Sequence, residues 1–512
     1  MTQIKFTILK QYLFLALFVV LVRVVFRLVF GGFSLEGATI AAMEGGKLAL
    51  WVLGFGLLNL FVDFRKFLKR SPKFLRRFNT ALGIALSLTA ELAQSFDRVK
   101  RASALRAHRR GIHFVRSVIV PVISNAIDQS IALADSMESR GFGQTLKPAT
   151  GAIALKNLNF AYQPNRPILK DVSISIPAGQ FTLVTGNTGS GKSTLLRVIQ
   201  AKIPGVGFVC QFPRQSFVGG TVFDELAFAL IQQGADPEAV KARVNELASK
   251  FNLDTKANPR ELSAGWQQRV AIAAALSSGA KILLLDEPFS ALDDSGTAQL
   301  VETLGELKTD GVSVVIAEHR LAPTSALVDA YLTFSDGRIT DHVPIQKPLV
   351  RKGSSGKVTA LVGENGSGKT TYLHKLAKES GVLIPQPASD LLFLETVAAE
   401  LAQADLDARK PLGTARAIFS RFFTDIDESQ NPRDLSEGQK LILALSIQLA
   451  KSSQMLMLDE PTLGLDTPNR QTLINIIGGL AAQNVEVLVA THDREFAEAI
   501  ANETLEVASV RQ

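Results

Sequence analysis

The chain has 512 residues, which suggests about three domains at roughly 100–200 residues each. Its net charge of +7 is unevenly distributed: residues 1–150 carry +13 and the rest carries −6. The basic surplus belongs to one region, so it is no argument that the whole chain binds nucleic acid. The single cysteine, Cys210, excludes an intrachain disulfide, and we interpret it as a small apolar residue ending a strand.

Two long apolar runs open the sequence. The first covers residues 12–30 with Arg23 and Arg27 inserted, and the second covers residues 38–62. About 20 helical residues cross a hydrocarbon core of ~30 Å, so both runs are predicted to be transmembrane helices. Seven Lys and Arg residues in 63–77 place that stretch and the N-terminus on the cytoplasmic side by the positive-inside rule. The two arginines would either contact another membrane subunit or reach towards the outer interface.

Residues 78–141 alternate apolar helical faces with basic segments, and the pattern leaves open whether they enter the bilayer or lie beneath it. Two stretches, RAHRRG at 106–111 and ADSMESRGFG at 134–143, end a helical pattern with Arg-Gly. Each can be explained as a basic helix end near lipid headgroups. A short linker is expected at 143–152.

The remaining chain holds one set of motifs twice, in the same order. In both copies a serine precedes an aspartate by the same interval: Ser263 precedes Asp286 in the first copy, and Ser436 precedes Asp459 in the second. The interval from that aspartate to a following histidine, His319 or His492, is also identical in the two copies. Such a repeat predicts two domains of one kind.

Each copy alternates strand-like apolar runs with helical stretches, which predicts an α/β fold. A strand at 181–185 leads into GNTGSGKST (186–194), and a strand at 358–362 leads into GENGSGKTT (363–371). Glycine-rich loops between a strand and a helix wrap phosphates with backbone N–H groups, so both are predicted P-loops. The nucleotide-contacting residues predicted there are Gly186, Asn187, Gly189, Ser190, Gly191, Lys192, Ser193 and Thr194, and Gly363, Glu364, Asn365, Gly366, Ser367, Gly368, Lys369, Thr370 and Thr371.

The other motifs supply the chemistry of ATP hydrolysis. Lys192 and Lys369 are expected to neutralise the β- and γ-phosphates. Mg²⁺ is expected at Ser193 with Asp286, and at Thr370 with Asp459. The next residues, Glu287 and Glu460, stand where a carboxylate would polarise the attacking water; the alternative is that they are buried acids at a strand end.

LSAGW (262–266) and LSEGQ (435–439) resemble the signature motif of ABC ATPases. The resemblance implies a head-to-tail pair, in which each signature completes the ATP site of the other half. One site would then take Lys192, Ser193, Gln211, Asp286, Glu287 and His319 from the first half with Ser436 and Gly438 from the second. The other would take Lys369, Thr370, Gln386, Asp459, Glu460 and His492 with Ser263 and Gly265. The glutamines Gln211 and Gln386 would report loss of the γ-phosphate.

The two copies differ on the adenine side. Tyr162 precedes Gly186 at the interval where ABC ATPases keep an aromatic residue that stacks on adenine, and no aromatic stands at that interval before Gly363. Trp266 also replaces the usual glutamine of the first signature. We therefore expect a shortened antiparallel subdomain in the second half and weaker ATP binding at its site.

The order of motifs in residues 1–143 resembles the transmembrane T component of energy-coupling factor (ECF) transporters, and the Q-loop regions around Gln211 and Gln386 resemble ECF-type ATPases. The resemblance implies that Arg110 and Arg140 couple the membrane region to the ATPases, although Arg109 and Ser139 stand where the family prefers alanine.

The expected organisation is multidomain: an α-helical membrane domain at residues 1–143, an incomplete T component, and two α/β P-loop ABC ATPase domains at 152–340 and 345–512. The expected function is the ATP-hydrolysing energising module of an ECF-type importer in the cell membrane, with its ATPase domains cytoplasmic and its membrane region in contact with lipid. A separate small substrate-binding membrane subunit would bring a vitamin, a vitamin precursor, cobalt or nickel, and no nucleic acid is expected.

Three alternatives remain. A soluble twin-ATPase ribosome factor usually needs a long charged linker, whereas only a short linker-like segment (340–356) separates these halves. An ABC exporter usually brings several more membrane spans for each ATPase than the two found here. The last alternative is a truncated, inactive relative.

Overall fold

The computed structural model describes most of the chain from Gly151 onwards and scattered residues before it. The described residues are 20, 39, 43–50, 54, 96, 98–101, 122, 126–127, 130, 133–134, 136–138, 140–141, 151–163, 166–319, 322–340, 356–422, 426–451 and 453–507. The chain divides into two compact units, residues 1–86 and 87–512.

The expected α-helical membrane domain is corrected by the structure. Among the described residues, no helix combines the length and the apolar character that crossing a bilayer demands. The structure shows two α/β P-loop domains instead. Several predictions fall outside the described residues. Most of the apolar runs 12–30 and 38–62 lies there, and so do the whole basic stretch 63–77 and the residues Arg23, Arg27 and Arg110.

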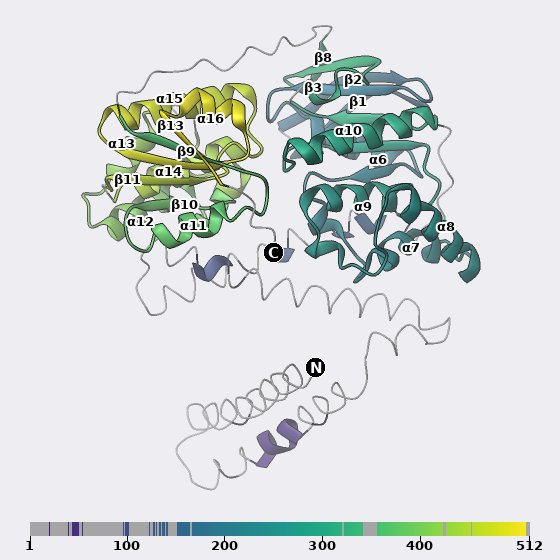
Figure 1. Ribbon diagram of the computed structural model, residues 1–512, viewed down its shortest axis with the longest axis horizontal. Coiled ribbons are helices and arrows are strands. Elements are labelled where there is room, and N and C mark those ends of the chain that lie inside the picture. The colour runs from purple at the N-terminus through teal and green to yellow at the C-terminus, as the bar shows by residue number, and fades with distance from the viewer. Residues whose placement is uncertain are drawn as a thin grey trace. The chain divides into compact units, whose positions relative to one another are not determined.

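The first domain is built on a six-stranded sheet in the order β4-β5-β6-β3-β7-β8 (Figure 1). Five strands are parallel, and β8 closes an antiparallel hairpin with β7. A separate antiparallel pair, β1 and β2, precedes the sheet. The bounds are β1 Ile153–Gln163, β2 Arg166–Ile176, β3 Phe181–Gly186, β4 Gly207–Val209, β5 Ile282–Asp286, β6 Ser313–Ala317, β7 Ala330–Ser335 and β8 Arg338–Thr340.

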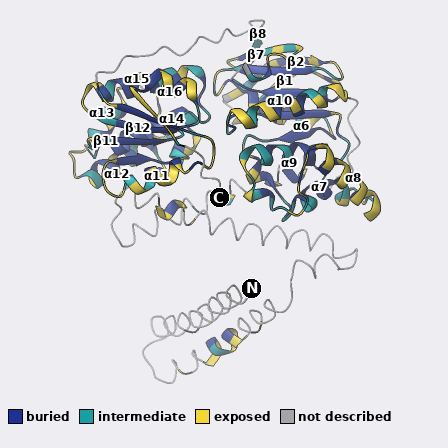
Figure 2. Ribbon diagram, in the orientation of Figure 1, coloured by how far each residue is buried: buried dark blue, intermediate teal, exposed yellow. Residues whose placement is uncertain are grey.

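Helices cover both faces of this sheet, so its central strands are buried along their length, as all five residues of β5 (ILLLD) illustrate. Helix α6 packs between the sheet and β2, while α7, α8 and α9 form a helical layer away from β1 and β2 (Figure 1). Exposed residues form stripes along α8 and α10 (Figure 2). The helices are α6 Lys192–Lys202, α7 Val222–Gln232, α8 Pro237–Lys250, α9 Ala264–Leu276 and α10 Asp294–Thr309, with the 3₁₀ turns η2 Pro213–Ser216, η3 Pro259–Glu261 and η4 Ala322–Thr324.

The second domain repeats this arrangement with a five-stranded parallel sheet in the order β10-β11-β12-β9-β13. Its strands occupy the places of β4, β5, β6, β3 and β7 in that order, so the sequence repeat is also a structural repeat. The strands are β9 Val358–Val362, β10 Val382–Ile384, β11 Met455–Asp459, β12 Glu486–Thr491 and β13 Glu503–Glu506. The helices are α11 Lys369–Leu376, α12 Val397–Ala408, α13 Thr414–Phe419, α14 Glu437–Leu449, α15 Thr467–Ala482 and α16 Arg494–Ile500, with η5 Ala388–Leu391 and η6 Pro432–Asp434.

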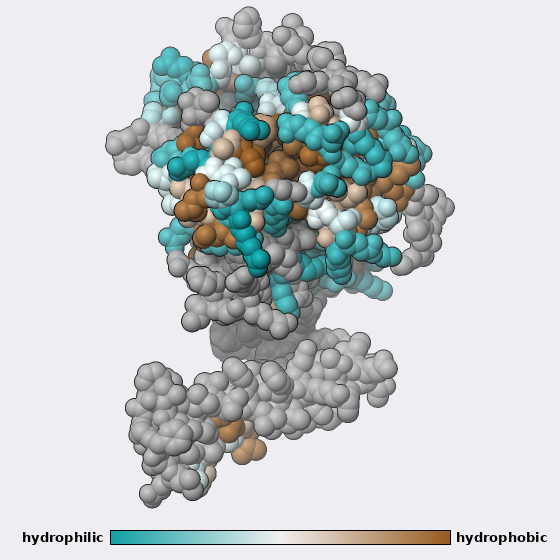
Figure 3. Space-filling view, turned by 90° about the vertical axis from the view of Figure 1, so that its left-hand side faces the viewer, coloured by the Kyte–Doolittle hydropathy of each residue, from teal (hydrophilic) through white to brown (hydrophobic). Residues whose placement is uncertain are grey.

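The second domain is smaller than the first on the face of its sheet that α11, the helix after the P-loop, covers. Its described residues contain no counterpart of β1, β2 and β8, and the apolar cluster around Leu373 is much smaller than the cluster around Leu195. At matched positions Leu195 is fully buried, whereas Tyr372 is 54% exposed. Figure 3 shows apolar side chains gathered in the middle of one face of the molecule, among hydrophilic ones.

Candidate nucleotide hydrolysis sites

Both P-loops have the backbone that phosphate binding requires. An ideal Cβ on Gly186 would lie 2.2 Å from Phe334 O, and Gly189 and Gly191 have φ values of +81° and +108°. In the second loop, Gly366 and Gly368 have φ values of +85° and +94°. Only glycine adopts such angles without strain, so the loops can turn their N–H groups inward.

The two P-loop lysines are buried and held by their own loops. Lys192 Nζ donates to Gly186 O at 2.7 Å and Asn187 O at 2.9 Å, and Lys369 Nζ donates to Gly363 O at 2.6 Å. Burial lowers the pKa of Lys192, although the surrounding carboxylates oppose this. Both ammonium groups therefore already point into the loops that would receive the phosphates.

The predicted Mg²⁺ residues come together in both halves. Ser193 Oγ donates to Asp286 Oδ1 at 2.9 Å, and Thr370 Oγ1 donates to Asp459 Oδ1 at 3.1 Å. Burial raises the pKa of Asp286 and raises that of Asp459 to about 6. Hydroxyl and carboxylate oxygens are the ligands that Mg²⁺ prefers, usually together with phosphate oxygens, so these pairs fit that ion.

The candidate general bases sit in strained positions at the ends of β5 and β11. Glu287 has φ +43° and Glu460 has φ +44°, and such strain at a non-glycine residue is typical of functional sites. Gln211 Nε2 donates to Glu287 Oε2 at 2.9 Å, which brings together two residues predicted for one site. Burial, with the nearby charge of Glu318, raises the pKa of Glu287 to about 7, a value suited to accepting a proton near neutral pH.

The two histidines are held by different carboxylates. His492 Nδ1 lies 2.8 Å from Glu460 Oε2, whereas His319 Nδ1 lies 2.9 Å from Glu318 Oε1. Burial lowers the pKa of each histidine, but the hydrogen bond and charge of the partner carboxylate outweigh it and leave both raised. Glu318 was not predicted from the sequence. The available signal was the residue before each histidine, which is Glu in the first half and Thr491 in the second.

Three hydrogen bonds join the P-loop of each half to the loop after the candidate base of the other. Thr188 N donates to Asp466 Oδ2 at 2.8 Å. Asn365 N donates to Asp293 Oδ2 at 3.4 Å, and Asn365 Nδ2 donates to Ala291 O at 3.2 Å. This reciprocal pattern is the one expected when the two halves pair head to tail.

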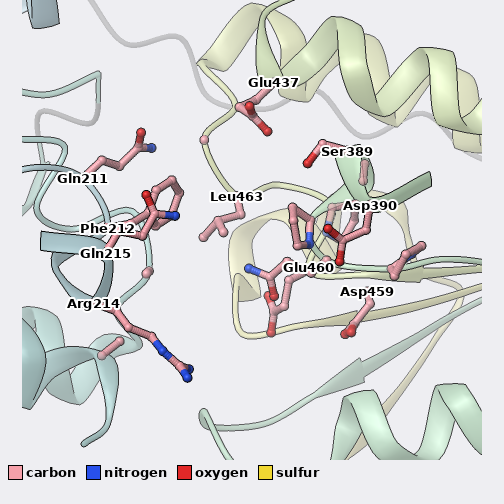
Figure 4. Close-up of a pocket in the computed structure, with 18 of the residues that line it drawn as sticks. Gln211, Phe212, Arg214, Gln215, Ser389, Asp390, Glu437, Asp459, Glu460 and Leu463 are labelled. Atoms are coloured by element: carbon pink, nitrogen blue, oxygen red, sulfur yellow. The ribbon is translucent and has the colours of Figure 1, made fainter. Parts of the chain in front are cut away.

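A cleft of about 790 Å³ lies between the halves. In Figure 4, Gln211, Phe212 and Arg214 line one side, and Ser389, Glu437 and Glu460 line the other. Pro385 and Gln386 belong to the same lining. Among the described residues, no hydrogen bond joins Ser263 or Ser436 to the opposite P-loop, so the signature serines remain predicted ligands.

The two signature helices begin differently. Ser436 caps α14 in a reciprocal pair with Gln439: its hydroxyl accepts from Gln439 N, and Ser436 N donates to Gln439 Oε1 at 2.9 Å. In the first half Trp266 replaces that glutamine, Ser263 makes no side-chain cap, and the Trp266 ring lies 5.0 Å from Arg269 Cζ. The Ser436 hydroxyl therefore takes part in a helix cap, whereas the Ser263 hydroxyl does not.

Tyr162 stands at the end of β1 and is 59% exposed. Its ring packs edge-on against Phe160, with centroids 4.9 Å apart. An exposed aromatic face on a strand is what adenine stacking needs, and its role there remains a prediction.

Arg140, one of the two expected coupling residues, makes a buried ion pair with Glu225 of α7; the side chains are 4% and 0% exposed. The other oxygen of Glu225 accepts from Val218 N at 2.7 Å and Gly219 N at 2.6 Å. In the second half Glu400 likewise accepts from Leu394 N at 2.6 Å and from Phe393 N. Arg140 is thus attached to the segment that follows Gln211.

Two sequence families match the repeats. The family described as "ABC transporter" matches residues 169–290, and the family described as "AAA domain, putative AbiEii toxin, Type IV TA system" matches residues 374–498. A protein of Streptomyces coelicolor named "Putative ABC transporter ATP-binding protein" is 29% identical, over 67% of this chain and 89% of its own length.

Among solved structures, cbiO1 from Clostridium perfringens, part of the ABC transporter complex cbiONQ, is 22% identical with a TM-score of 0.34, over 38% of this chain and 87% of its own. The archaeal ribosome recycling factor aABCE1, in complex with the ribosomal stalk protein aP1, is 20% identical with a TM-score of 0.46, over 68% of this chain and 87% of its own. The sequence matches and the repeated P-loop geometry show two ABC ATPase-type domains in one chain, which bind ATP and make it an ATP hydrolase.

Proposed function

We propose that this chain energises an ECF-type ABC importer at the cell membrane, where its cytoplasmic ATPase domains drive a separate small substrate-binding membrane subunit. The solute class we propose is a vitamin, a vitamin precursor, or cobalt or nickel. One observation carries the proposal: the buried pair of Arg140 with Glu225 attaches the segment before the ATPases to the loop that follows Gln211. Relatives named as ABC transporter ATP-binding proteins support the transport context.

In the proposed cycle, Lys192 and the P-loop N–H groups hold the phosphates while Glu287 accepts a proton from the attacking water. Ser193 and Asp286 would hold Mg²⁺, which when bound offsets phosphate charge. Gln211 would respond to loss of the γ-phosphate, and its hydrogen bond to Glu287 at 2.9 Å joins the base to the segment whose Glu225 pairs with Arg140. The second site works in the same way through Lys369 and Glu460.

The deciding experiment is detergent purification of the tagged chain from native membranes, with mass spectrometry of the proteins that accompany it. A small, very hydrophobic membrane protein in stoichiometric amount supports the importer. Recovery with ribosomes contradicts it and supports the alternative of a ribosome-associated twin ATPase.

A second experiment tests coupling. Charge reversal of both arginines, Arg110→Glu with Arg140→Glu, is expected to abolish solute uptake while ATP binding persists. Lys241→Glu, on the exposed face of α8, is the matched control and should leave uptake unchanged. Uptake at the wild-type rate in the double variant removes both arginines from the coupling role.

A further inference from the structure

The first hydrolysis site contains a buried carboxylate that has no counterpart in the second. Glu318 follows directly after β6, is 0% exposed, and donates its backbone N–H to Val184 O at 3.0 Å, just before the P-loop. The matched residue in the second half is Thr491, also buried, whose hydroxyl accepts from Asp493 N at 3.0 Å. One position therefore holds a carboxylate in one half and a neutral hydroxyl in the other.

Each histidine is held twice by one carboxylate oxygen, but the carboxylate differs. His319 N and Nδ1 lie 2.8 Å and 2.9 Å from Glu318 Oε1. His492 N and Nδ1 lie 3.2 Å and 2.8 Å from Glu460 Oε2. The second half thus uses its candidate base to hold the histidine, and the first half provides a separate residue for that purpose.

We propose that Glu318 is a positioning residue of the first site, which fixes His319 so that Glu287 is left to the attacking water and to Gln211. An ionised carboxylate only accepts hydrogen bonds, so His319 Nδ1 must be the donor, and Nε2 is the nitrogen left for the γ-phosphate. A carboxylate that orients a histidine in this way is a recurrent device at active sites. In the second site Glu460 holds His492 and serves as the base. The inference rests on ATP hydrolysis and is independent of the importer role.

The test is single-turnover ATP hydrolysis in a Glu460→Gln background, where the measured rate belongs to the first site. Glu318→Ala is expected to lower the rate at saturating ATP at least tenfold and to leave the half-saturating ATP concentration within twofold. Glu318→Gln keeps an oxygen that accepts both N–H groups, so it should restore most of the rate. Because Glu318 acts through His319, the variant Glu318→Ala with His319→Ala should be no slower than His319→Ala alone.

Thr491→Ala, in a Glu287→Gln background, is the matched control and should change second-site turnover less than twofold, because Glu460 holds His492 there. If Glu318→Ala does not fold, Glu318→Met fills the same space without an acceptor and should show the same tenfold loss. The proposal is overturned if the rate stays within twofold in the folded variant, if the loss adds to that of His319→Ala, or if only the half-saturating concentration changes.

Discussion

Removing the charge of Arg140 should destabilise the first ATPase domain measurably. In Arg140→Met most of the side-chain volume is kept, and Glu225 is left as a buried carboxylate without its cation. Breaking one partner of a buried ion pair costs ~3–5 kcal/mol. Because Glu225 keeps its bonds from Val218 N and Gly219 N, we expect the lower end of that range, about 3 kcal/mol.

The assay is urea unfolding followed by tryptophan fluorescence. The chain has two tryptophans, so a Trp51→Phe background leaves Trp266 of α9 as the reporter of the first domain. With a slope of roughly 2 kcal/mol/M, the midpoint should fall by about 1.5 M. Adding Glu225→Gln should recover part of the loss, since it removes the unpaired charge.

The control is Lys250→Met, which breaks a half-exposed ion pair with Asp310 in the same domain and should cost at most about 1 kcal/mol. Equal midpoints for Arg140→Met and Lys250→Met would refute the reasoning, because the Arg140 pair would then contribute no more than a surface contact.

Three further predictions concern the ATP sites. Glu287→Gln should stabilise the nucleotide-free protein at pH 8 but not at pH 4. The pKa of Glu287 is about 7 in the folded protein and 4.5 ordinarily, so the folded state favours the protonated carboxyl. The free energy of unfolding of the wild type therefore falls by up to about 3 kcal/mol as the pH rises from 4.5 through 7. A melting-temperature difference that is independent of pH would contradict this. Tyr162→Ala should weaken ATP binding at the first site about tenfold, with Tyr162→Phe near wild type, in equilibrium titrations; equal affinity for all three rules out stacking. Lys192→Ala leaves only the second site intact, and Lys369→Ala leaves only the first. In nucleotide titrations the Lys192→Ala variant should bind ATP more weakly than the Lys369→Ala variant; comparable affinities would contradict the prediction of unequal sites.

The α/β repeats were predictable because the motifs directly follow or end strand-like apolar runs, and so mark where those strands end. The run predicted at 358–362 is β9 without change, and the run predicted at 181–185 is β3, which extends it only into Gly186. The pairing of Ser193 with Asp286 followed from the same motifs, since both lie at strand or loop ends of one sheet edge.

Contacts between distant residues could not be predicted in the same way. Arg140 and Glu225 are 85 residues apart, and no local period joins them. The sequence contains Glu318 next to His319, but only the structure shows that its carboxylate contacts the histidine ring. The predicted membrane domain was wrong: among the residues that the structure describes, no helix is long and apolar enough to cross a bilayer, and hydropathy alone measures only the composition of a run.

The joining of two unequal halves in one polypeptide has a consequence for how they evolve. Only the short segment 341–355 separates the described end of β8 from Gly356. A short tether gives each half an effective concentration of its partner on the order of millimolar, so pairing of one half with a second copy of itself is suppressed by mass action. Each half therefore always meets the other type, and neither must preserve self-complementarity. A difference such as Thr491 in place of the acid at 318, or the strands β1 and β2, which among the described residues precede only the first P-loop, can then persist in one half without a matching change in its partner.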